Sequence, residues 1–363
     1  MRRFPHLAVL GVLLPCLTLS TTSYGAKKKA PAPAVQTYIV MVGAESPHRG
    51  VGFNAYFPES VTIHVGDTVQ WQQNANEIHT VTFLAGTTPA ALIIPAAEAG
   101  FPPTPSPLLF NPVAVDPAVP ADGLYDGTTY ANSGLMGREE GQVQEFSLTF
   151  TRAGTYDYMC LVHGVMMSGQ VVVVAPDVSV PSPNQQMAEG RKQIARNLSQ
   201  VPAVLRAAEA QIQPPVKNPD GTVTHYVAIG YTEGQIALMQ FFPDKLNVRA
   251  GDTVIWEMSP HNDMPHTVTF LNGEPEPSLV IPVPQPSGPP LLYADPATFF
   301  PSAPGPMLIR EGIYNSGVME PIPGTTYTLI VGDMTPGPEP YICLLHDTSG
   351  MKGALTVVPR HEK

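Results

Sequence analysis

The same loop motif occurs twice in this chain of 363 residues. In each copy a cysteine is followed three residues later by a histidine, as Cys160 and His163 in the first half and Cys343 and His346 in the second. A methionine, a glycine and a short strand-like run come next. Thiolate, imidazole and thioether form a soft ligand set, which selects copper when a second histidine completes a trigonal site with a weak axial methionine. The motif therefore predicts two copper sites, each still short of one ligand.

A histidine that precedes each motif supplies the missing ligand. His79 and His266 each begin the hexamer His-Thr-Val-Thr-Phe-Leu, which is identical in the two halves. We expect these to be the deeper ligands and the loop histidines to lie near the surface, where an outer ring edge could pass an electron to a partner. The predicted metal ligands form two sets of four: His79, Cys160, His163 and Met167, and His266, Cys343, His346 and Met351.

The axial methionine of the first set has two candidates, Met166 and Met167. Met167 is preferred because it begins a Met-x-Gly-x-Val frame that parallels the Met-x-Gly-x-Leu frame of Met351, which leaves Met166 as a packing residue. Histidine and methionine are four positions apart in the first loop and five in the second. Because loop length changes the distance from the axial sulfur to the metal, the two coppers should differ in potential. Thr80 and Thr267 follow the strand histidines, and we hypothesise that their hydroxyls tie the ligand loops together.

The two halves repeat one another far beyond the motif. Matched positions keep an offset of 183 to 187 residues throughout, which indicates an internal duplication of one domain. Matching segments include Tyr56-Phe-Pro58 with Phe241-Phe-Pro243, Gly66-Asp-Thr-Val with Gly251-Asp-Thr-Val, and Asn132-Ser-Gly with Asn315-Ser-Gly. The predicted organisation is a signal peptide at residues 1–25, a flexible tether at 26–36, a first domain at 37–176, a helical spacer at 177–220 and a second domain at 221–359.

Composition indicates short strands joined by many turns, because the charged fraction is only 13% and the chain holds 42 prolines and 31 glycines. Val61, Ile63 and Val65 alternate with polar residues, as in a half-buried strand. Both halves carry a long proline-rich insertion, at residues 85–130 and 272–312. We expect these insertions to form an ordered cover on the barrel, with an irregular surface excursion as the alternative.

Helical sequence is confined to the region between the copies. Asn184–Ser199 and Pro202–Gln211 are rich in alanine, glutamine, arginine and leucine, and Pro202 suits the first turn of a second helix. We interpret this stretch as a spacer that packs on one domain, with its basic side chains in solvent.

The N-terminus predicts export to the periplasm or the extracellular space. Arg2 and Arg3 precede an apolar run, Leu7–Leu19, and a small-residue exit, as in a secretory signal peptide. No later segment has the length of a membrane span. Loss of residues 1–25 takes the formal charge from −11 to −13, because they hold two arginines and no acid. This charge disfavours nucleic acid and favours basic protein partners.

Cys160 and Cys343 are the only cysteines left after the signal peptide. In an oxidising compartment two cysteines invite a disulfide. Here they occupy equivalent positions in two copies of one motif, and a bridge between them would disable both sites. We therefore expect two separate metal-binding thiolates.

Apart from the tether, the long insertions and the helical spacer, the chain after the signal peptide resembles the plastocyanin, amicyanin and pseudoazurin family of blue copper proteins, the cupredoxins. The resemblance rests on His-Thr-Val, Asn-Ser-Gly and the run Phe-x-x-x-Gly-x-Tyr-x-Tyr-x-Cys-x-x-His-x-x-x-Met-x-Gly-x-Val, which ends at Val171. It implies an all-β fold of two tandem Greek-key β-barrels or sandwiches, one type-1 copper per domain, and electron transfer with redox proteins such as basic cytochromes or copper enzymes. The chain departs from the small family members at Thr80, where they carry asparagine, and in its long insertions.

Three functions compete for this pattern. A two-domain multicopper oxidase or a nitrite-reductase-like enzyme needs further histidines, but no His-x-His pair occurs and the residues before the cysteines are Met159 and Ile342. His261, five residues before His266, is a loop residue or an alternative ligand. A copper carrier or storage protein would use the same ligands, but the chain lacks a Met-rich or His-rich tract. We therefore expect an electron carrier with two blue copper sites and no enzyme activity.

Overall fold

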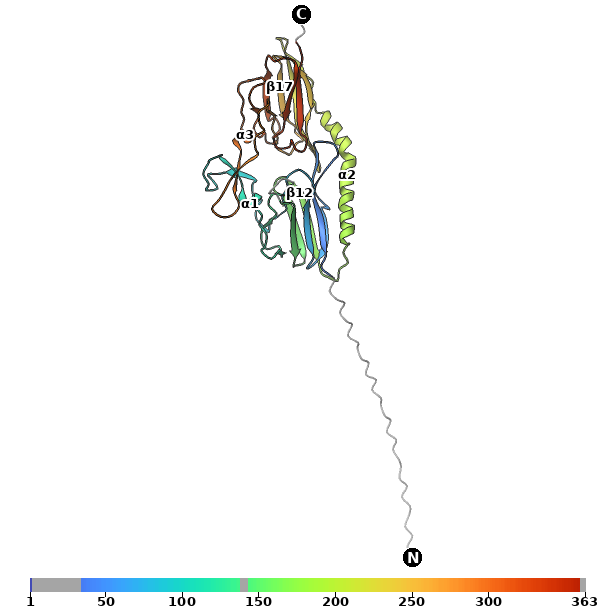
Figure 1. Cartoon of the computed structure of the whole chain (residues 1–363). Coiled ribbons are helices and arrows are strands. Elements are labelled where there is room, and N and C mark those ends of the chain that lie inside the picture. The colour runs from blue at the N-terminus through green and yellow to red at the C-terminus, as the bar shows by residue number, and fades with distance from the viewer. Residues whose placement is uncertain (2–33, 138–142, 360–363) are drawn as a thin grey trace. The chain divides into compact units, whose positions relative to one another are not determined.

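The computed structural model describes Met1 and residues 34–137 and 143–359. The predicted signal peptide and most of the predicted tether lie outside these residues. Across the described part of the chain, strands outweigh three helices, which confirms the all-β prediction (Figure 1). The elements of the first half are β1 (Thr37–Glu45), β2 (Val51–Phe57), β3 (Ser60–His64), β4 (Thr68–Gln73), β5 (Thr82–Phe83), β6 (Ile93–Pro95), β7 (Leu108–Phe110), α1 (Pro112–Val115), β8 (Leu124–Tyr125), β9 (Ala131–Asn132), β10 (Glu145–Phe150), β11 (Gly154–Cys160) and β12 (Gly164–Val174).

The second half repeats this series after a long helix. Its elements are α2 (Pro183–Glu209), β13 (Val216–Lys217), β14 (Val223–Glu233), β15 (Ile236–Phe242), β16 (Lys245–Val248), β17 (Thr253–Met258), β18 (Thr269–Phe270), β19 (Val280–Val283), β20 (Leu291–Ala294), α3 (Pro296–Phe299), β21 (Met307–Leu308), β22 (Tyr314–Asn315), β23 (Thr326–Val331), β24 (Gly337–Ile342) and β25 (Lys352–Val357). The match of the two series supports the duplication inferred from the sequence.

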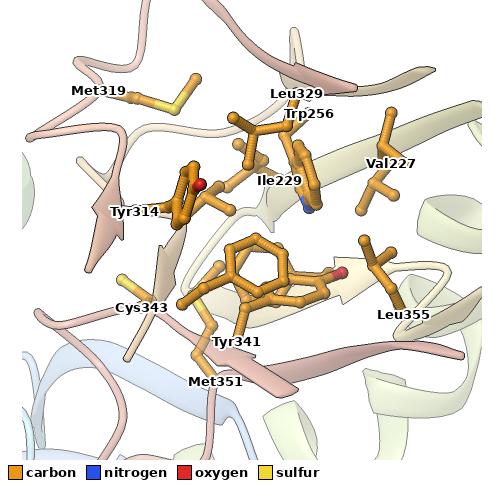
Figure 2. Close-up of a cluster of buried hydrophobic side chains, with 14 of the residues drawn as sticks. Val227, Ile229, Trp256, Tyr314, Met319, Leu329, Tyr341, Cys343, Met351 and Leu355 are labelled. Carbon is orange, nitrogen blue, oxygen red and sulfur yellow. The ribbon is translucent and has the colours of Figure 1, made fainter. Parts of the chain in front are cut away.

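Each half has a core of its own between two packed sheets. One layer of each half belongs to a large common sheet, and the other is a separate five-stranded sheet, β3-β12-β11-β5-β9 or β16-β25-β24-β18-β22. In the second core, Trp256 is fully buried and its ring centroid lies 5.5 Å from that of Tyr341. Figure 2 shows these rings together with Cys343 and Met351. The matching pair in the first core, Trp71 and Tyr158, lies 5.2 Å apart, so the cysteine loops rest on equivalent aromatic cores.

The common sheet runs through both halves because β2 pairs with β15. The pairing is antiparallel, with Phe53 opposite Ile236, Gly52 opposite Ala237 and Val51 opposite Leu238. In the repeat offset of 185 residues, Gly52 is the counterpart of Ala237, so the contact joins equivalent strands about a local twofold axis. This pairing protects two strand edges that would otherwise expose unpaired backbone groups. The described residues from Val35 onward form one compact unit.

The two insertions are ordered, and they also pair with each other. β6, β7, β20 and β19 form a four-stranded sheet in which β7 lies beside β20. Phe110 and Phe299 meet at 5.9 Å within a buried cluster that includes Leu161, the residue after Cys160. The predicted ordered cover is therefore present, and it contacts the first ligand loop at Leu161. The structure adds that it is built jointly by both halves, because each insertion leaves an apolar strand edge that the other covers.

The helical region corrects the prediction of two helices. α2 is a single helix that begins at a Ser182 capping box, and Pro202 lies inside it. It also packs on both halves rather than on one, since Val201 and Val204 join a buried cluster with Phe57 and Leu238. An internal proline costs a helix about 3 kcal/mol. Burial of this apolar face offsets that cost, because most helical stability in proteins comes from tertiary packing.

A substitution at Gly190 tests the contact between α2 and the end of β2. A Cβ on this residue would lie 2.7 Å from both Phe57 C and Pro58 N, which is too close for either backbone atom. We expect Gly190→Ala to lower the free energy of unfolding by about 1–3 kcal/mol, although alanine normally stabilises a helix by about 1 kcal/mol relative to glycine. Urea denaturation followed by far-ultraviolet circular dichroism measures the change. Ser199→Ala on the exposed face is the control, and an equal gain in both variants would contradict the contact.

Candidate metal centres

The strand histidines are held by backbone pairing and by a glycine beneath the ring. His79 exchanges two hydrogen bonds with Met136, whose N–H donates to the histidine carbonyl at 2.7 Å. Gly43 adopts a φ of 66°, and a Cβ there would lie 2.5 Å from His79 Nε2. Gly230 has the same role in the second half, where a Cβ would lie 2.6 Å from His266 Nε2. Only glycine allows the backbone to approach the ring this closely.

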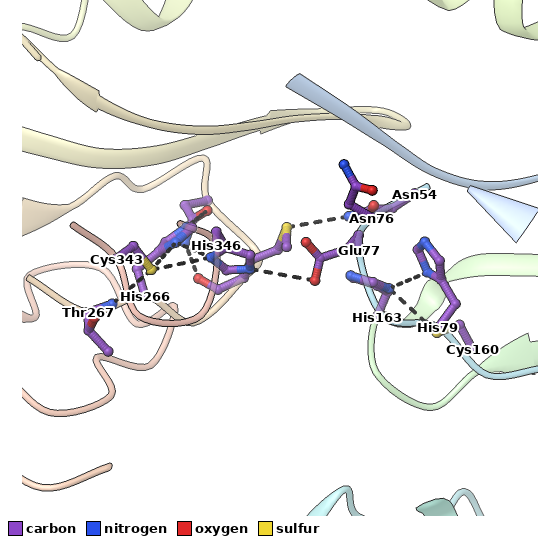
Figure 3. Close-up of polar contacts among 12 residues, drawn as sticks. Asn54, Asn76, Glu77, His79, Cys160, His163, His266, Thr267, Cys343 and His346 are labelled. Atoms are coloured by element: carbon purple, nitrogen blue, oxygen red, sulfur yellow. Dashed lines mark hydrogen bonds and ion pairs between the residues drawn. The ribbon is translucent and has the colours of Figure 1, made fainter. Parts of the chain in front are cut away.

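In the first centre the ligand atoms converge from two loops, the histidine loop with His79 and the cysteine loop with Cys160 and His163. His79 Nδ1 lies 3.2 Å from His163 Nδ1, and Cys160 Sγ lies 3.5 Å from the same nitrogen. His79 and Cys160 are fully buried, whereas His163 is half-buried. Figure 3 shows the three side chains pointing toward one another.

The second centre has almost the same geometry. His266 Nδ1 lies 3.1 Å from His346 Nδ1, and Cys343 Sγ lies 3.4 Å from His346 Nδ1 and 3.8 Å from His266 Nδ1. These two triads are the groups of three or more metal-ligating side chains found in residues 34–137 and 143–359. The structure therefore brings together six of the eight predicted ligands as two separate triads.

Both predicted axial methionines are buried, whereas the alternative candidate in the first loop is exposed. Met167 and Met351 are both fully buried, and they belong to the same apolar clusters as Cys160 and Cys343 respectively. Met351 lies against its cysteine, since Cys343 N–H donates to the Met351 carbonyl at 3.1 Å. Met166 is 60% exposed, so its side chain points away from the first core. This placement favours Met167 over Met166 as the candidate ligand.

The threonine hypothesis is confirmed by hydrogen bonds in both halves. The Thr80 hydroxyl accepts from Leu161 N–H, and the Thr267 hydroxyl accepts from Leu344 N–H, both at 2.8 Å. The Thr80 N–H also faces Cys160 Sγ at 3.4 Å. One residue therefore links the histidine loop to the cysteine loop, which fixes the distance between their ligand atoms.

Burial sets the protonation of the ligands. It lowers the pKa of His163 to about 4 and of His346 to about 3, and it holds the pKa of His79 and His266 well below the usual range. All four rings are neutral near pH 7, with a lone pair free for a metal. Burial also raises the pKa of the Cys343 thiol to about 11. A bound metal would displace this proton, because metal ligation deprotonates a thiol outright.

The donor set fits a soft metal ion. Zinc lies about 2.0 Å from histidine nitrogen and about 2.3 Å from cysteine sulfur, and an ion at similar bond lengths spans the 3.2 and 3.5 Å edges of the first triad. Two imidazoles and one thiolate beside a buried thioether are the ligands of blue copper sites. The residues present therefore fit one copper ion in each half.

Asn262, which the sequence reasoning missed, distinguishes the second centre from the first. Asn262 Oδ1 lies 3.1 Å from His266 Nε2 and accepts its hydrogen bond when Nδ1 is the metal ligand. At the repeat offset of 187 residues its counterpart is Ala75, and His79 Nε2 is buried with no hydrogen-bond partner. An alignment of the two halves of the chain contains this difference, but nothing in the sequence shows that position 262 faces the His266 ring.

The loop histidines are less exposed than predicted. His346 is only 3% exposed, because Glu77 of the first half packs against it, with Glu77 Oε1 3.8 Å from His346 Nε2 (Figure 3). Burial raises the pKa of Glu77 to about 8. His163 keeps partial exposure, although its Nε2 is buried. The expectation of a surface histidine is therefore wrong for the second centre, since another part of the chain covers it.

Two further predictions from the sequence concern His261 and the pairing of the two cysteines. His261 is exposed, and its ring lies 5.2 Å from that of Tyr231. It is therefore outside the second triad. Cys160 and Cys343 are both free thiols, each within its own triad.

Residues 48–174 match a family described as copper binding proteins, plastocyanin/azurin family. This segment belongs to that family. Similar solved structures include an oxidised amicyanin variant, at 24% identity over 38% of this chain and 82% of that one, with a TM-score of 0.22. A Cu(I) form of another amicyanin variant is 25% identical over 39% of this chain and 86% of that one, also with a TM-score of 0.22. No curated protein matches the chain.

This match makes the first half of the chain cupredoxin-like, and the triad within it suits the copper that the family is described as binding. The family match covers the first triad and ends before the second. The second triad therefore rests on its own geometry, which repeats that of the first. Within the described residues, none of the helices combines the length and the apolar content needed to span a bilayer.

A substitution at Gly230 tests the close contact between the Gly230 backbone and the His266 ring. Gly230→Ala should displace His266 and lower copper affinity at the second centre by roughly 10–100-fold, the usual effect of losing a contact that orients a ligand. Copper titration with a competing chelator measures the affinity. Gly234→Ala is the matched control, because Gly234 has a similar φ of 60° but nothing within 4 Å of a Cβ. Equal losses in both variants would assign the effect to backbone strain and contradict the contact.

Proposed function

We propose that this protein is an exported electron carrier with two mononuclear blue copper sites. The first set of ligands is His79, Cys160, His163 and Met167, and the second is His266, Cys343, His346 and Met351. The observation that carries the proposal is the convergence of two Nδ1 atoms and one Sγ atom in each half, with edges of 3.1–3.8 Å. The proposed domains are residues 37–176 and 221–359, linked by residues 177–220.

The side chains would keep each site ready for electron transfer. Bound copper supplies a one-electron couple between its cupric and cuprous forms. The thiolate and the two imidazoles approach from loops that hydrogen bonds and glycine contacts hold in place, so the ligands need little movement when the charge changes. Met167 and Met351 are fully buried, which keeps water away from the thioether of each proposed ligand set. A dry, rigid ligand set suits electron transfer better than metal exchange, which requires ligands to open.

We propose no enzyme activity for the two sites, because the sequence has no His-x-His pair and the residues before the two cysteines are Met159 and Ile342. We propose redox proteins as the partners, with basic cytochromes or copper enzymes as candidates that suit the formal charge of −13, which is −11 less the two arginines of residues 1–25. The signal-peptide pattern at residues 1–25 supports export to the periplasm or the extracellular space.

Removing the cysteines tests the function directly. The intact protein should bind two coppers and absorb strongly in the visible range, through thiolate-to-copper charge transfer. Cys160→Ser and Cys343→Ser should each remove about half of this absorption, and the double variant should remove all of it. Metal analysis and a visible spectrum measure both quantities. Persistence of the colour in the double variant would refute the ligand assignment, and a colourless protein that yields Cu(I) readily to a chelator would indicate storage instead.

Asn262 should tune the second site alone. Its hydrogen bond makes His266 a stronger electron donor, which favours the more highly charged cupric ion. Asn262→Ala reproduces the first half and should raise the potential of the second site by on the order of tens of millivolts, given about 1 kcal/mol per hydrogen bond and 59 mV per tenfold change. Redox titration of the visible bands measures the shift. The first site is the internal control, and a shift of both sites together would contradict a local effect.

A further inference from the structure

The two centres face each other within the chain. Glu77 lies between the loop histidines of the two halves, and Figure 3 shows it with His346 on one side and His163 on the other. Its carboxylate oxygen is 3.8 Å from His346 Nε2, and its side chain is only 11% exposed. His163 Nε2 is buried as well and has no hydrogen-bond partner. The ring edges that point away from the two ligand sets are therefore directed into the contact between the halves.

Metal ligation would define what these edges present. In both triads the Nδ1 atoms converge, so a neutral ring that binds metal through Nδ1 carries its proton on Nε2. The His346 Nε2–H then points at the Glu77 carboxyl group. This places ligand, carboxyl group and second ligand in succession, with protein atoms in place of solvent between the two sites.

The contact is held from several directions. Gly50 N–H of the first half donates to the Ser349 carbonyl on the second ligand loop at 2.7 Å. Asn54 Nδ2 lies 3.4 Å from Met264 Sδ. Met264 is the residue of the second half that corresponds to Glu77 in the repeat. The pairing of β2 with β15 fixes the two halves around these contacts. The spacing of the two centres is thus set by the fold.

The two centres differ in their access to solvent. His346 is 3% exposed, and residues of the first half cover its loop. The equivalent loop of the first centre stays open, since Val165 is 75% exposed and Met166 is 60% exposed. A reductant in solution therefore reaches the first centre more easily than the second.

We infer that the two centres exchange electrons directly through His163, Glu77 and His346, and that the second centre communicates with solvent mainly through the first. With copper held by both triads, one electron would pass from the reduced centre to the oxidised one, while no bond would form or break and no proton would need to leave. Glu77 acts as a positioning residue that fills the gap and holds the His346 edge. The inference rests on the proposed function, because it requires copper at both centres.

The test follows a single electron in the full-length, copper-loaded protein. Met167→Gln serves as the background, because an amide oxygen is a harder ligand than a thioether and should lower the potential and change the colour of the first centre. A flash-generated methyl viologen radical, in less than one equivalent per chain, should reduce the first centre initially. The first colour should then return while the second fades, at a rate independent of protein concentration. Cys343→Ser in the same background should lack this second phase.

Variants of Glu77 test whether the electron passes through the contact between His163, Glu77 and His346. Glu77→Leu should slow the second phase roughly tenfold or more, the usual range for losing a group that orients a metal ligand, whereas Glu77→Gln keeps an oxygen acceptor and should restore most of the rate. The matched control is Glu59→Gln, because Glu59 also joins the halves, through Gln235, but is not part of the route through the histidines. Copper content should stay at two ions per chain in all three variants, and Glu59→Gln should also keep the redox potentials and electron paramagnetic resonance spectra of the intact protein.

The outcomes separate this inference from the proposed function. Two coppers with intense colour, but a second phase whose rate rises with protein concentration, would leave the function standing and overturn direct exchange. An unchanged rate in Glu77→Leu would overturn the assigned route. Loss of copper or colour in the intact protein would instead refute the proposed function. The concentration test needs no change at Glu77, so it remains decisive if Glu77→Leu fails to fold.

Discussion

The antiparallel contact between β2 and β15 determines how the rest of this molecule is arranged. It joins two equivalent strands about a local twofold axis and turns two sandwiches into parts of one sheet. The insertions pair with each other through β7 and β20, and α2 packs its apolar face on residues of both halves. Each of these contacts buries surface that a separate domain would expose, so the duplicated chain resembles a dimer closed within one polypeptide.

The duplication produced near-identical ligand geometry but different surroundings. Both triads have histidine nitrogens 3.1–3.2 Å apart, and a glycine supports the strand histidine in each. The first centre has Ala75 where the second has Asn262, and Glu77 stands where the second half has Met264. Such changes leave the ligands in place while altering the hydrogen bonds and the solvent access around them. Two centres of one origin can thereby acquire different potentials and different partners.

The significance of Glu77 comes from its position in the fold and not from its place in the sequence. A carboxyl group two residues before a ligand is unremarkable in the sequence, because acids are common in exposed loops. In the fold it packs against His346, a candidate ligand of the other half, and burial raises its pKa to about 8. A group that crosses between repeats in this way connects two sites that the sequence alone presents as independent.

The sequence by itself determined the candidate ligand types and the β fold, because Cys-x-x-His, the identical hexamers and strand periodicity are local patterns repeated at a nearly constant offset. It also favoured Met167 over Met166, since the Met-x-Gly frame recurs. Only the tertiary structure decided that α2 continues through Pro202, that the insertions pair with each other, and that His346 is covered. Each of these depends on a surface supplied by residues far away in the chain, and local propensity carries no information about such a surface.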